Sequence, residues 1–257
     1  MAETVYDPGD DAPATCAFCV AVERVASIDD SDPIVEHVAG EAVVNCHRET
    51  PAGHSFCLFH QLPSDREEVP AIYDDCKAKP ATRATISDDK LAQLFRRTIL
   101  GVTEDNGDTC EVVPSGLTHD ATVRHRNQFV GAQFGSIKLT YDNINPADNY
   151  PIDLRESGIS EIEWSHANIG KDIRLTGATV EGGVSLNSAT VMGEVSLRDA
   201  TVEGEVLLHG ATIEGDVLLN DATVEGVVRL HDATVEGDVS LHDATVERDV
   251  SLGGATV

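Results

Sequence analysis

An eleven-residue repeat in the C-terminal half of the sequence limits what this chain can fold into more than any other feature. Seven units aligned on alanine begin at Ala178, the first reading ATVEGGVSLNS and the last ATVERDVSLGG. The segments from Ala167 (ANIGKDIRLTG) and Ala121 (ATVRHRNQFVG) fit the same frame, while AQFGSIKLTY and SGISEIEWSH are shorter pieces built from five-residue steps. Repetition therefore extends from about residue 118 to 257, interrupted by a polar insertion at 142–151. Such a pattern predicts a stack of similar structural units.

Apolar residues occupy positions 1, 3, 7 and 9 of each unit, so they form two pairs that are each spaced by two residues. This spacing places both members of a pair on one face of an extended strand and excludes a helix. Corner sequences such as Glu-Gly-Asp and His-Asp separate the pairs, and we expect the glycine to supply the positive φ of a sharp corner. Coils stacked about 4.8 Å apart would pair each short strand above and below and bury the apolar columns. The repeat therefore predicts a β-solenoid.

The recurring A-x-V/I/L followed by a corner resembles the pentapeptide-repeat family, in a variant that alternates five-residue and six-residue faces. The resemblance covers about half the chain and implies a mainly β fold, a right-handed four-sided parallel β-helix in which two units make one coil. Roughly six coils would then give a rod of about 30 Å at the usual inter-strand spacing. The eleven-residue period alone leaves a flat, two-sided coil open as the alternative.

The remaining sequence divides into three segments. We expect a flexible acidic N-terminus at 1–14, a Cys/His head at 15–63, and a linker at 64–117 ahead of the solenoid at 118–257. The linker contains one helix at 87–100, which begins at a capping serine, has two aspartates in its first turn and ends before a glycine. We expect this helix to cover the N-terminal end of the solenoid, where an exposed coil would pair with another chain. No comparable cap follows the last repeat, so a homodimer through that coil and a longer natural protein are both open.

Charge narrows the classes of partner. The formal net charge is −27, with 45 acidic against 18 basic residues, and the acid is spread along the whole chain. Spread acid with few lysines resembles the proteins of halophilic archaea, and the alternative is an acidic surface selected for a basic partner. Direct nucleic-acid binding is not expected, because it needs a surplus of Lys and Arg. No apolar run is long enough to span a membrane and no secretory signal is present, so we expect a cytoplasmic protein with reduced thiols.

Five residues near the N-terminus have the types and spacing of metal ligands. Cys57 and His60 form C-x2-H, Cys16 and Cys19 form C-x2-C, and Cys46 lies between the two pairs. Thiolates and an imidazole suit tetrahedral zinc, which needs four of the five. A structural, closed zinc site is therefore predicted, and the pattern resembles short zinc-binding heads that precede pentapeptide repeats in halophilic archaeal proteins. The alternatives are that Cys19 is a core residue and His60 a surface residue, or that the cluster holds a catalytic thiol.

Stacked coils would place equivalent residues of the repeat units in columns, and two such columns are found at positions 4 and 10. Position 4 is glutamate in six units, so stacked coils would place like charges about 5 Å apart, and we expect the solenoid to loosen when salt is removed. These residues are Glu181, Glu203, Glu214, Glu225, Glu236 and Glu247. His209, His231 and His242 recur at position 10, a corner, where we interpret them as solvated side chains, with metal chelation by stacked neighbours as the alternative.

The leading functional interpretation is a non-enzymatic protein that offers a rigid acidic surface to an unidentified protein partner. Three alternatives stay open. Some pentapeptide-repeat relatives imitate duplex DNA and inhibit topoisomerases, the chain could be the soluble part of a longer membrane-associated protein, and parallel β-helices also support polysaccharide-active enzymes. Such an enzyme would need paired carboxylates, and only the insertion offers them, with Asp142, Asp148 and Asp153 near Arg155. No catalytic residue is predicted.

Overall fold

The protein is described by a computed structural model, which divides into two compact units, Met1–Gln128 and Phe129–Val257. The structure describes residues 16, 19–22, 28, 31–32, 34–46, 48, 57, 59–60, 95, 99, 128–144 and 151–257. The predicted acidic N-terminus, most of the predicted linker and the first predicted repeat residues, 118–127, lie outside the described residues.

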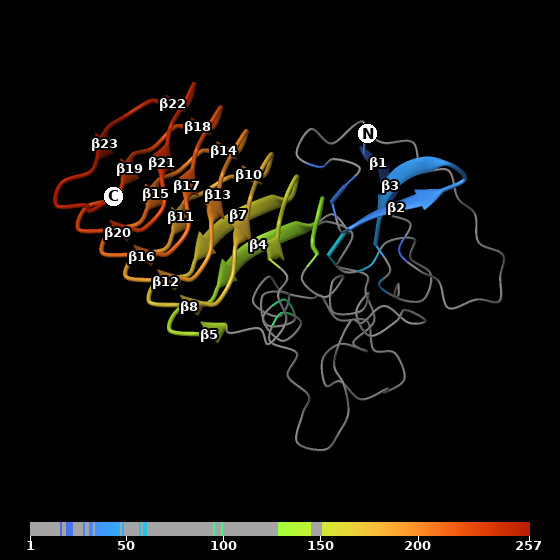
Figure 1. The fold of residues 1–257 in the computed structure, drawn as a ribbon, viewed down its shortest axis with the longest axis horizontal. Helices are drawn as coiled ribbons and strands as arrows, with labels where there is room; N and C mark the ends of the chain where they lie inside the picture. Colours follow the sequence, from blue (N-terminus) through green and yellow to red (C-terminus); the bar gives the residue numbers. More distant parts are fainter. Residues whose placement is uncertain are drawn as a thin grey trace, which may run out of the picture. The chain divides into compact units, whose positions relative to one another are not determined.

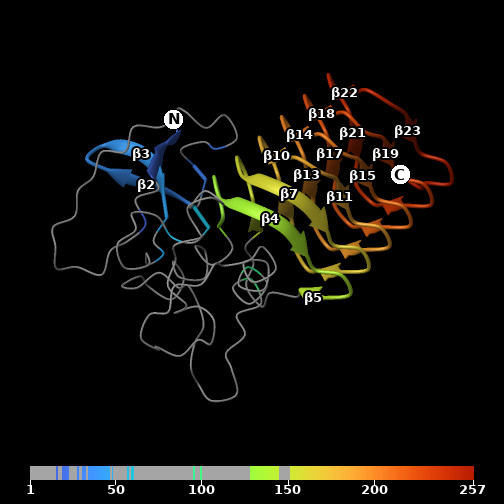
Figure 2. The same ribbon diagram turned by 180° about the vertical axis from the view of Figure 1, so that it is seen from behind.

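The second unit is the predicted β-solenoid, in which parallel strands stack coil upon coil (Figures 1 and 2). Paired residues of adjacent coils are 22 positions apart, as for Thr179 with Thr201 and Val195 with Val217. One coil therefore uses two eleven-residue units and has four sides. The four-sided coil is confirmed and the flat two-sided alternative is wrong.

Two neighbouring sides of the solenoid, faces A and B, both begin with the long strands β4 and β7. Face A stacks six strands in the order β22-β18-β14-β10-β7-β4, and face B continues from β7 through β11, β15 and β19 to β23. Six stacked strands span about five turns, or about 24 Å at 4.8 Å per turn. The bounds are β4 Gln133–Lys138, β7 Gly158–Glu163, β10 Thr179–Val180, β11 Val184–Ser185, β14 Thr201–Val202, β15 Val206–Leu207, β18 Thr223–Val224, β19 Val228–Arg229, β22 Thr245–Val246 and β23 Val250–Ser251.

The other two sides are each a separate five-stranded sheet. Face C contains β5 Asn143–Ile144, β8 Asn168–Ile169, β12 Thr190–Val191, β16 Thr212–Ile213 and β20 Thr234–Val235. Face D contains β6 Ile152–Asp153, β9 Ile173–Arg174, β13 Val195–Ser196, β17 Val217–Leu218 and β21 Val239–Ser240. The predicted insertion falls between β5 and β6, although its first residues form β5, and residues 145–150 lie outside the described part.

Unit length explains why β4 and β7 are longer than the strands stacked on them. Both lie in the ten-residue pieces AQFGSIKLTY and SGISEIEWSH, which lack one residue of the corner between the two apolar pairs. The shorter corner lets six residues run as one strand, whereas Glu-Gly-Asp corners break the later units into two-residue strands. As a result, β7 pairs with β10 through its first residues and with β11 through its last.

Positive φ angles occur at a different corner position from the one that we predicted. They fall on position 11, where non-glycine residues such as Asp199, Asp221 and Asp232 have φ near 55°. Here the amide of the following alanine donates to the carbonyl of position 9, as from Ala233 to Leu230 at 3.0 Å, in a turn of type II character.

The position 5 glycines serve close approach between coils instead. A Cβ on Gly204 would lie 2.5 Å from the backbone of Gly182 in the adjacent coil, and Gly204 has no positive φ. Glycine is therefore needed at this corner because the backbones of stacked coils nearly touch there, and not because of its left-handed conformation.

The solenoid core follows the predicted apolar positions. The side chains at positions 1, 3, 7 and 9 are almost wholly buried from Ala178 through Ala233, and Trp164 is also inaccessible to solvent. Backbone amides outside the short strands donate to an adjacent coil, for example from Glu203 to Val180 of the preceding coil at 2.9 Å. Hydrogen bonds therefore connect coil to coil along the whole stack, which makes the solenoid rigid.

The first unit contains a three-stranded antiparallel sheet in the order β1-β3-β2, formed by Cys19–Ala21, Glu41–Asn45 and Val35–Val38. Ala39 and Gly40 join β2 to β3 with positive φ at both residues, the geometry of a type I′ hairpin turn. Of the predicted helix at 87–100, the structure describes Phe95 and Ile99, and both are helical and buried. Its place over the solenoid stays a prediction. Among the described residues, no helix combines the length and apolar character needed to cross a membrane.

Candidate metal centre

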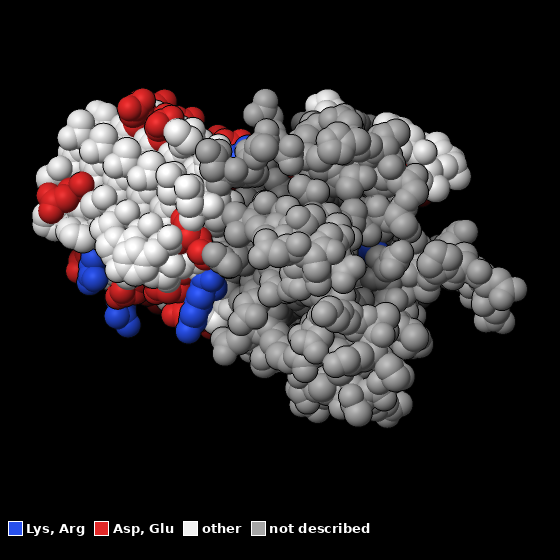
Figure 3. All heavy atoms as spheres, turned by 90° about the horizontal axis from the view of Figure 1, so that it is seen from below, with Lys and Arg blue, Asp and Glu red and all other residues white. Residues whose placement is uncertain are grey.

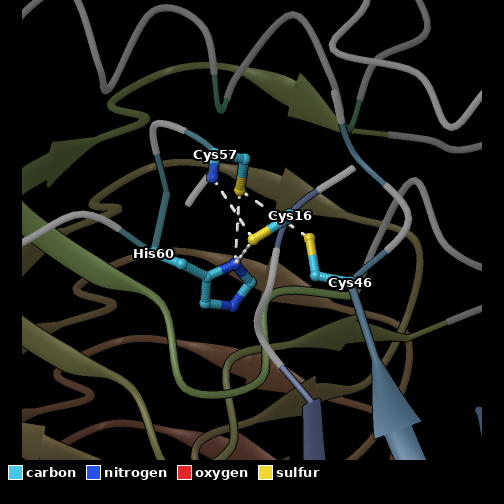
Figure 4. A group of neighbouring side chains, drawn as sticks. All are labelled: Cys16, Cys46, Cys57 and His60. Atoms are coloured by element: carbon cyan, nitrogen blue, oxygen red, sulfur yellow. Dashed lines mark hydrogen bonds between the residues drawn. The ribbon is translucent and has the colours of Figure 1, made fainter. Parts of the chain in front are cut away.

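Four of the five predicted ligands meet in the first unit. Cys16, Cys46, Cys57 and His60 each direct one ligand atom toward the others, and these atoms all lie within 4.8 Å of one another (Figure 4). All four side chains are buried. We call this group the Cys3His cluster.

The antiparallel sheet brings two of the ligands together. Cys46 directly follows β3, and the pairing of β1 with β3 continues past both strand ends, where the Cys16 amide donates to the Arg48 carbonyl at 2.9 Å. Cys16 is therefore opposite Arg48, two residues from Cys46 and on the same face of the ladder. The register of β1 against β3 therefore brings the Cys16 and Cys46 thiols together.

The same register excludes Cys19 from the cluster. Cys19 pairs with Asn45, so its side chain is on the face of Asn45, opposite to that of the adjacent Cys46. Its thiol is exposed, and partial burial together with the charges of Glu36 and Glu41 raises its pKa. The interpretation of Cys19 as a core residue and of His60 as a surface residue is therefore wrong on both counts, since His60 is only 8% exposed.

The C-x2-H motif supplies the other two ligands from one tight turn. The His60 amide donates to the Cys57 carbonyl at 3.0 Å, which closes a four-residue turn. This turn aims the Cys57 thiol and the His60 ring in the same direction, with 3.2 Å between Sγ and Nδ1. Phe59, inside the turn, is fully buried and anchors it in the core of the unit.

Contacts across the cluster are short. Cys46 Sγ lies 3.7 Å from Cys57 Sγ, and Cys16 Sγ lies 3.5 Å from His60 Nδ1. The Cys57 amide donates to Cys16 Sγ at 3.2 Å. The two sulfurs at 3.7 Å are too far apart for a disulfide, which needs about 2.05 Å. Accordingly, none of the described cysteines forms a disulfide.

Electrostatics make Cys46 the thiolate of the group. Burial alone would raise its pKa, but hydrogen bonds from Cys16 and Cys57 and the charge of His60 together hold the pKa well below the ordinary value. Burial likewise opposes the charge on His60, yet the neighbouring Cys46 and Cys57 raise its pKa to about 10. The hydrogen bond with Cys46 raises the pKa of Cys16 to about 12, and burial raises that of Cys57 well above its usual range. The protonated groups are therefore Cys16, Cys57 and His60.

Arg48 is a buried neighbour of the Cys3His cluster that the sequence analysis missed. The residue is 1% exposed, and its Nη1 lies 3.8 Å from Cys46 Sγ and donates a hydrogen bond of 2.8 Å to the Gln128 carbonyl oxygen. The guanidinium also lies over the Phe59 ring, 5.2 Å from its centroid. A buried arginine next to a thiolate supplies positive charge to the cluster. The only available signal was its position two residues after Cys46, which does not distinguish a buried arginine from a surface one.

The other candidate residues that the structure describes lie in the solenoid. Asp153 and Arg155 form a buried, two-point ion pair, with 2.6 Å from Nη2 to Oδ2 and 2.8 Å from Nε to Oδ1. The charge of each side chain is therefore balanced by the other. This is a structural ion pair, whereas a polysaccharide-active site would need two carboxylates that face a substrate. Asp142 is half-buried beside β5, and Asp148 lies outside the described residues.

One comparison with known proteins finds a match. Residues 208–256 match the family described as pentapeptide repeats (9 copies). Comparison with curated proteins finds no match, and comparison with solved structures finds none either. The matched segment lies entirely within the four-sided solenoid, and the same eleven-residue pattern continues upstream of it without a change of register. The chain therefore carries pentapeptide repeats over residues 208–256, within a four-sided β-solenoid.

Proposed function

We propose that this protein is a non-enzymatic scaffold whose solenoid binds another protein, and that structural zinc in the Cys3His cluster holds its N-terminal head together. The observation that carries the proposal is the contrast between the two units. One unit has four buried ligand atoms that all lie within 4.8 Å of one another, and the other has a regular surface held by coil-to-coil hydrogen bonds.

The spacing of the ligand atoms supports zinc. In a tetrahedral site with Zn–S of about 2.3 Å and Zn–N of about 2.0 Å, two sulfurs are about 3.8 Å apart and a sulfur and a nitrogen about 3.5 Å apart. The Cys46–Cys57 and Cys16–His60 distances are 3.7 and 3.5 Å, and the Cys57–His60 pair, at 3.2 Å, would have to open by about 0.3 Å. The ion would need little rearrangement of these side chains.

Charge balance supports the same ion. Three thiolates and a neutral imidazole give Zn²⁺ a net charge of −1, which is costly in a buried site unless a cation compensates it. Arg48 provides that cation beside Cys46. Zinc would supply only cross-linking here, because all four ligands come from the protein and no position is left open for water.

Zinc content measured by mass spectrometry on the purified chain tests this part of the proposal. We expect one zinc per chain, lost in Cys57→Ser and retained in the matched control Cys19→Ser, whose thiol is on the other face of the sheet. Equal zinc content in the two variants would contradict the assigned ligand set.

The scaffold part rests on the outer surface of the solenoid. Outward-facing threonines recur on the opposite faces A and C, where Thr201 and Thr212 are exposed and held by coil-to-coil hydrogen bonds. On the face seen in Figure 3, acidic side chains form groups at the margins of the solenoid, some of them beside Lys or Arg, with largely uncharged surface between them. A flat, preorganised surface of this kind loses little entropy when a partner binds.

Arginine substitutions on the two faces test partner binding. Thr201→Arg changes face A and Thr212→Arg changes face C at equivalent repeat positions. We expect affinity isolation from the native cells to recover a protein with the wild type, and one variant, but not the other, to lose it. Recovery of the same proteins by all three forms would contradict a partner-binding face.

Charge density favours a second candidate, mimicry of duplex DNA. Residues 178–257 contain 15 acidic and three basic side chains, a net charge of −12 with histidine neutral. At 22 residues and about 4.8 Å per coil, this is about one negative charge per 1.5 Å of axis, close to the value of about 1.7 Å for duplex DNA.

A supercoiling assay with a purified topoisomerase, run in concentrated salt, tests this candidate. We expect the wild type to inhibit supercoiling and a variant with Glu203, Glu225 and Glu247 changed to glutamine to inhibit less. A lack of inhibition by excess wild-type protein would rule the candidate out without affecting the scaffold proposal.

A further inference from the structure

We propose that one corner of the solenoid binds a divalent transition-metal ion through His209, His231 and Asp232. Each residue offers one ligand atom, and the three atoms lie within 4.8 Å of one another. All three side chains are exposed to solvent, whereas the ligands of the Cys3His cluster are buried.

Stacking brings the two histidines together. Both occupy position 10 of their units and are 22 residues apart, which is one coil. Their rings meet edge to face with centroids 5.6 Å apart. Asp232 is the next residue after His231, and its Oδ2 lies 3.2 Å from His231 Nδ1.

The backbone under these side chains is fixed. The Gly210 amide donates to the His231 carbonyl and the Asp232 amide to the Gly253 carbonyl, each at 2.9 Å. The corner therefore presents its ligands from a rigid frame, which reduces the entropy lost when they bind one ion.

The next coil leaves the ligands uncovered because it has two glycines at this corner. A Cβ on Gly253 would lie 3.8 Å from the His231 ring, and Asp232 Oδ1 occupies the space that a Cβ on Gly254 would fill. The ion would therefore remain open to water, or to a ligand atom from another molecule.

Two imidazoles and a carboxylate suit Cu²⁺, Ni²⁺ and Zn²⁺, with Cu²⁺ held most tightly. Ligand atoms about 2.1 Å from a single ion are about 3.0 to 4.2 Å apart, so the exposed side chains must move by about 1 Å to bind it. Exposed side chains can make this rotation without disturbing the core.

The opposite corner provides a natural control. His242 and Asp243 form the same dyad, with 3.0 Å between Nδ1 and Oδ2, but the residue one coil below is Asn220 rather than a histidine. If two imidazoles are required, this corner binds weakly, and Asn220→His should create a second site. Asparagine occurs naturally at this repeat position, in Asn187 and Asn220, so His→Asn changes suit the solenoid.

Calorimetric titration of the full chain with Ni²⁺ tests the proposal, with nickel used because Cu²⁺ reacts with thiols. We expect one Ni²⁺ per chain in addition to the metal of the head. His209→Asn and His231→Asn should each weaken this binding at least about tenfold, whereas His242→Asn should leave it unchanged. Asn220→His should raise the stoichiometry to two.

Three results would overturn the site. They are no nickel binding by the wild type, an equal loss of affinity in all three His→Asn variants, and no added equivalent in Asn220→His. Unchanged circular dichroism and melting of each variant would confirm that the comparison is between folded proteins.

Discussion

Replacing Arg48 with methionine should weaken zinc binding by the head about a thousandfold. The guanidinium and the Cys46 sulfur are both buried and 3.8 Å apart. At an effective dielectric constant of about 20, two unit charges at this distance attract by about 4 kcal/mol. Without zinc the cluster has a net charge of zero, because Cys46 is ionised and His60 is protonated, and with zinc it has a net charge of −1. Arg48 therefore gains about one such attraction when the ion binds. A tenfold change in affinity corresponds to about 1.4 kcal/mol, so the loss of this gain amounts to about three orders of magnitude.

Competition with a chromophoric zinc chelator measures this difference directly. Arg48→Lys keeps the charge but loses the planar fork that reaches the Gln128 carbonyl, so we expect an intermediate affinity. Arg198→Met, an exposed arginine of the solenoid, should leave zinc affinity unchanged. If Arg48→Met bound zinc as tightly as the wild type, charge compensation by Arg48 would be refuted.

Three further predictions concern proton release on zinc binding, the stability of glycine variants at the corners, and the salt dependence of the melting temperature. Zinc uptake near neutral pH should release about three protons, because three of the four ligands are protonated without the ion, and zinc affinity should therefore fall as the pH falls. A pH indicator in weakly buffered solution measures the release, and uptake without it would contradict this protonation state. Gly204→Ala should destabilise the solenoid by about 1–3 kcal/mol in denaturant unfolding, whereas Gly253→Ala, whose Cβ meets only a ring at 3.8 Å, should be nearly neutral. Equal stability of the two variants would argue against close approach at the corner. Melting temperature should drop when molar salt is removed, and less so in Glu225→Gln, because stacked glutamates repel more when screening is weak; a melting temperature independent of salt would disprove this.

The solenoid could be predicted from the sequence because its determinants are local and repeated. Spacing by two within each apolar pair requires a strand, and repetition of the pair requires a stack. The number of sides could not be derived in this way, because it depends on which residue lies above which, and the pairing of Thr179 with Thr201 supplies that information. The role of the corner glycines was also out of reach, since close approach between Gly204 and Gly182 involves residues 22 positions apart.

The types of residue in the candidate metal centre could be predicted from the sequence, but which four of the five candidates meet could not. Residue types and spacing identified the five candidates, yet the choice of Cys16 over Cys19 depends on strand register. The two cysteines are three residues apart and therefore face opposite sides of the ladder. Arg48 was missed for a related reason, since its burial depends on contacts with Phe59 and Gln128 that no local pattern encodes.

Because one coil consists of two eleven-residue repeats, the number of repeats by which such a protein can change its length during evolution is restricted. Each coil contacts only its neighbours, so duplicating 22 residues would lengthen the stack and leave every downstream side chain pointing in its original direction. Duplicating a single eleven-residue unit would instead turn everything downstream by half a revolution. The corner that carries His209 and His231 would then point to the opposite side of the upstream coils. A lineage that must keep several surface features aligned along one side can therefore gain or lose units only in pairs.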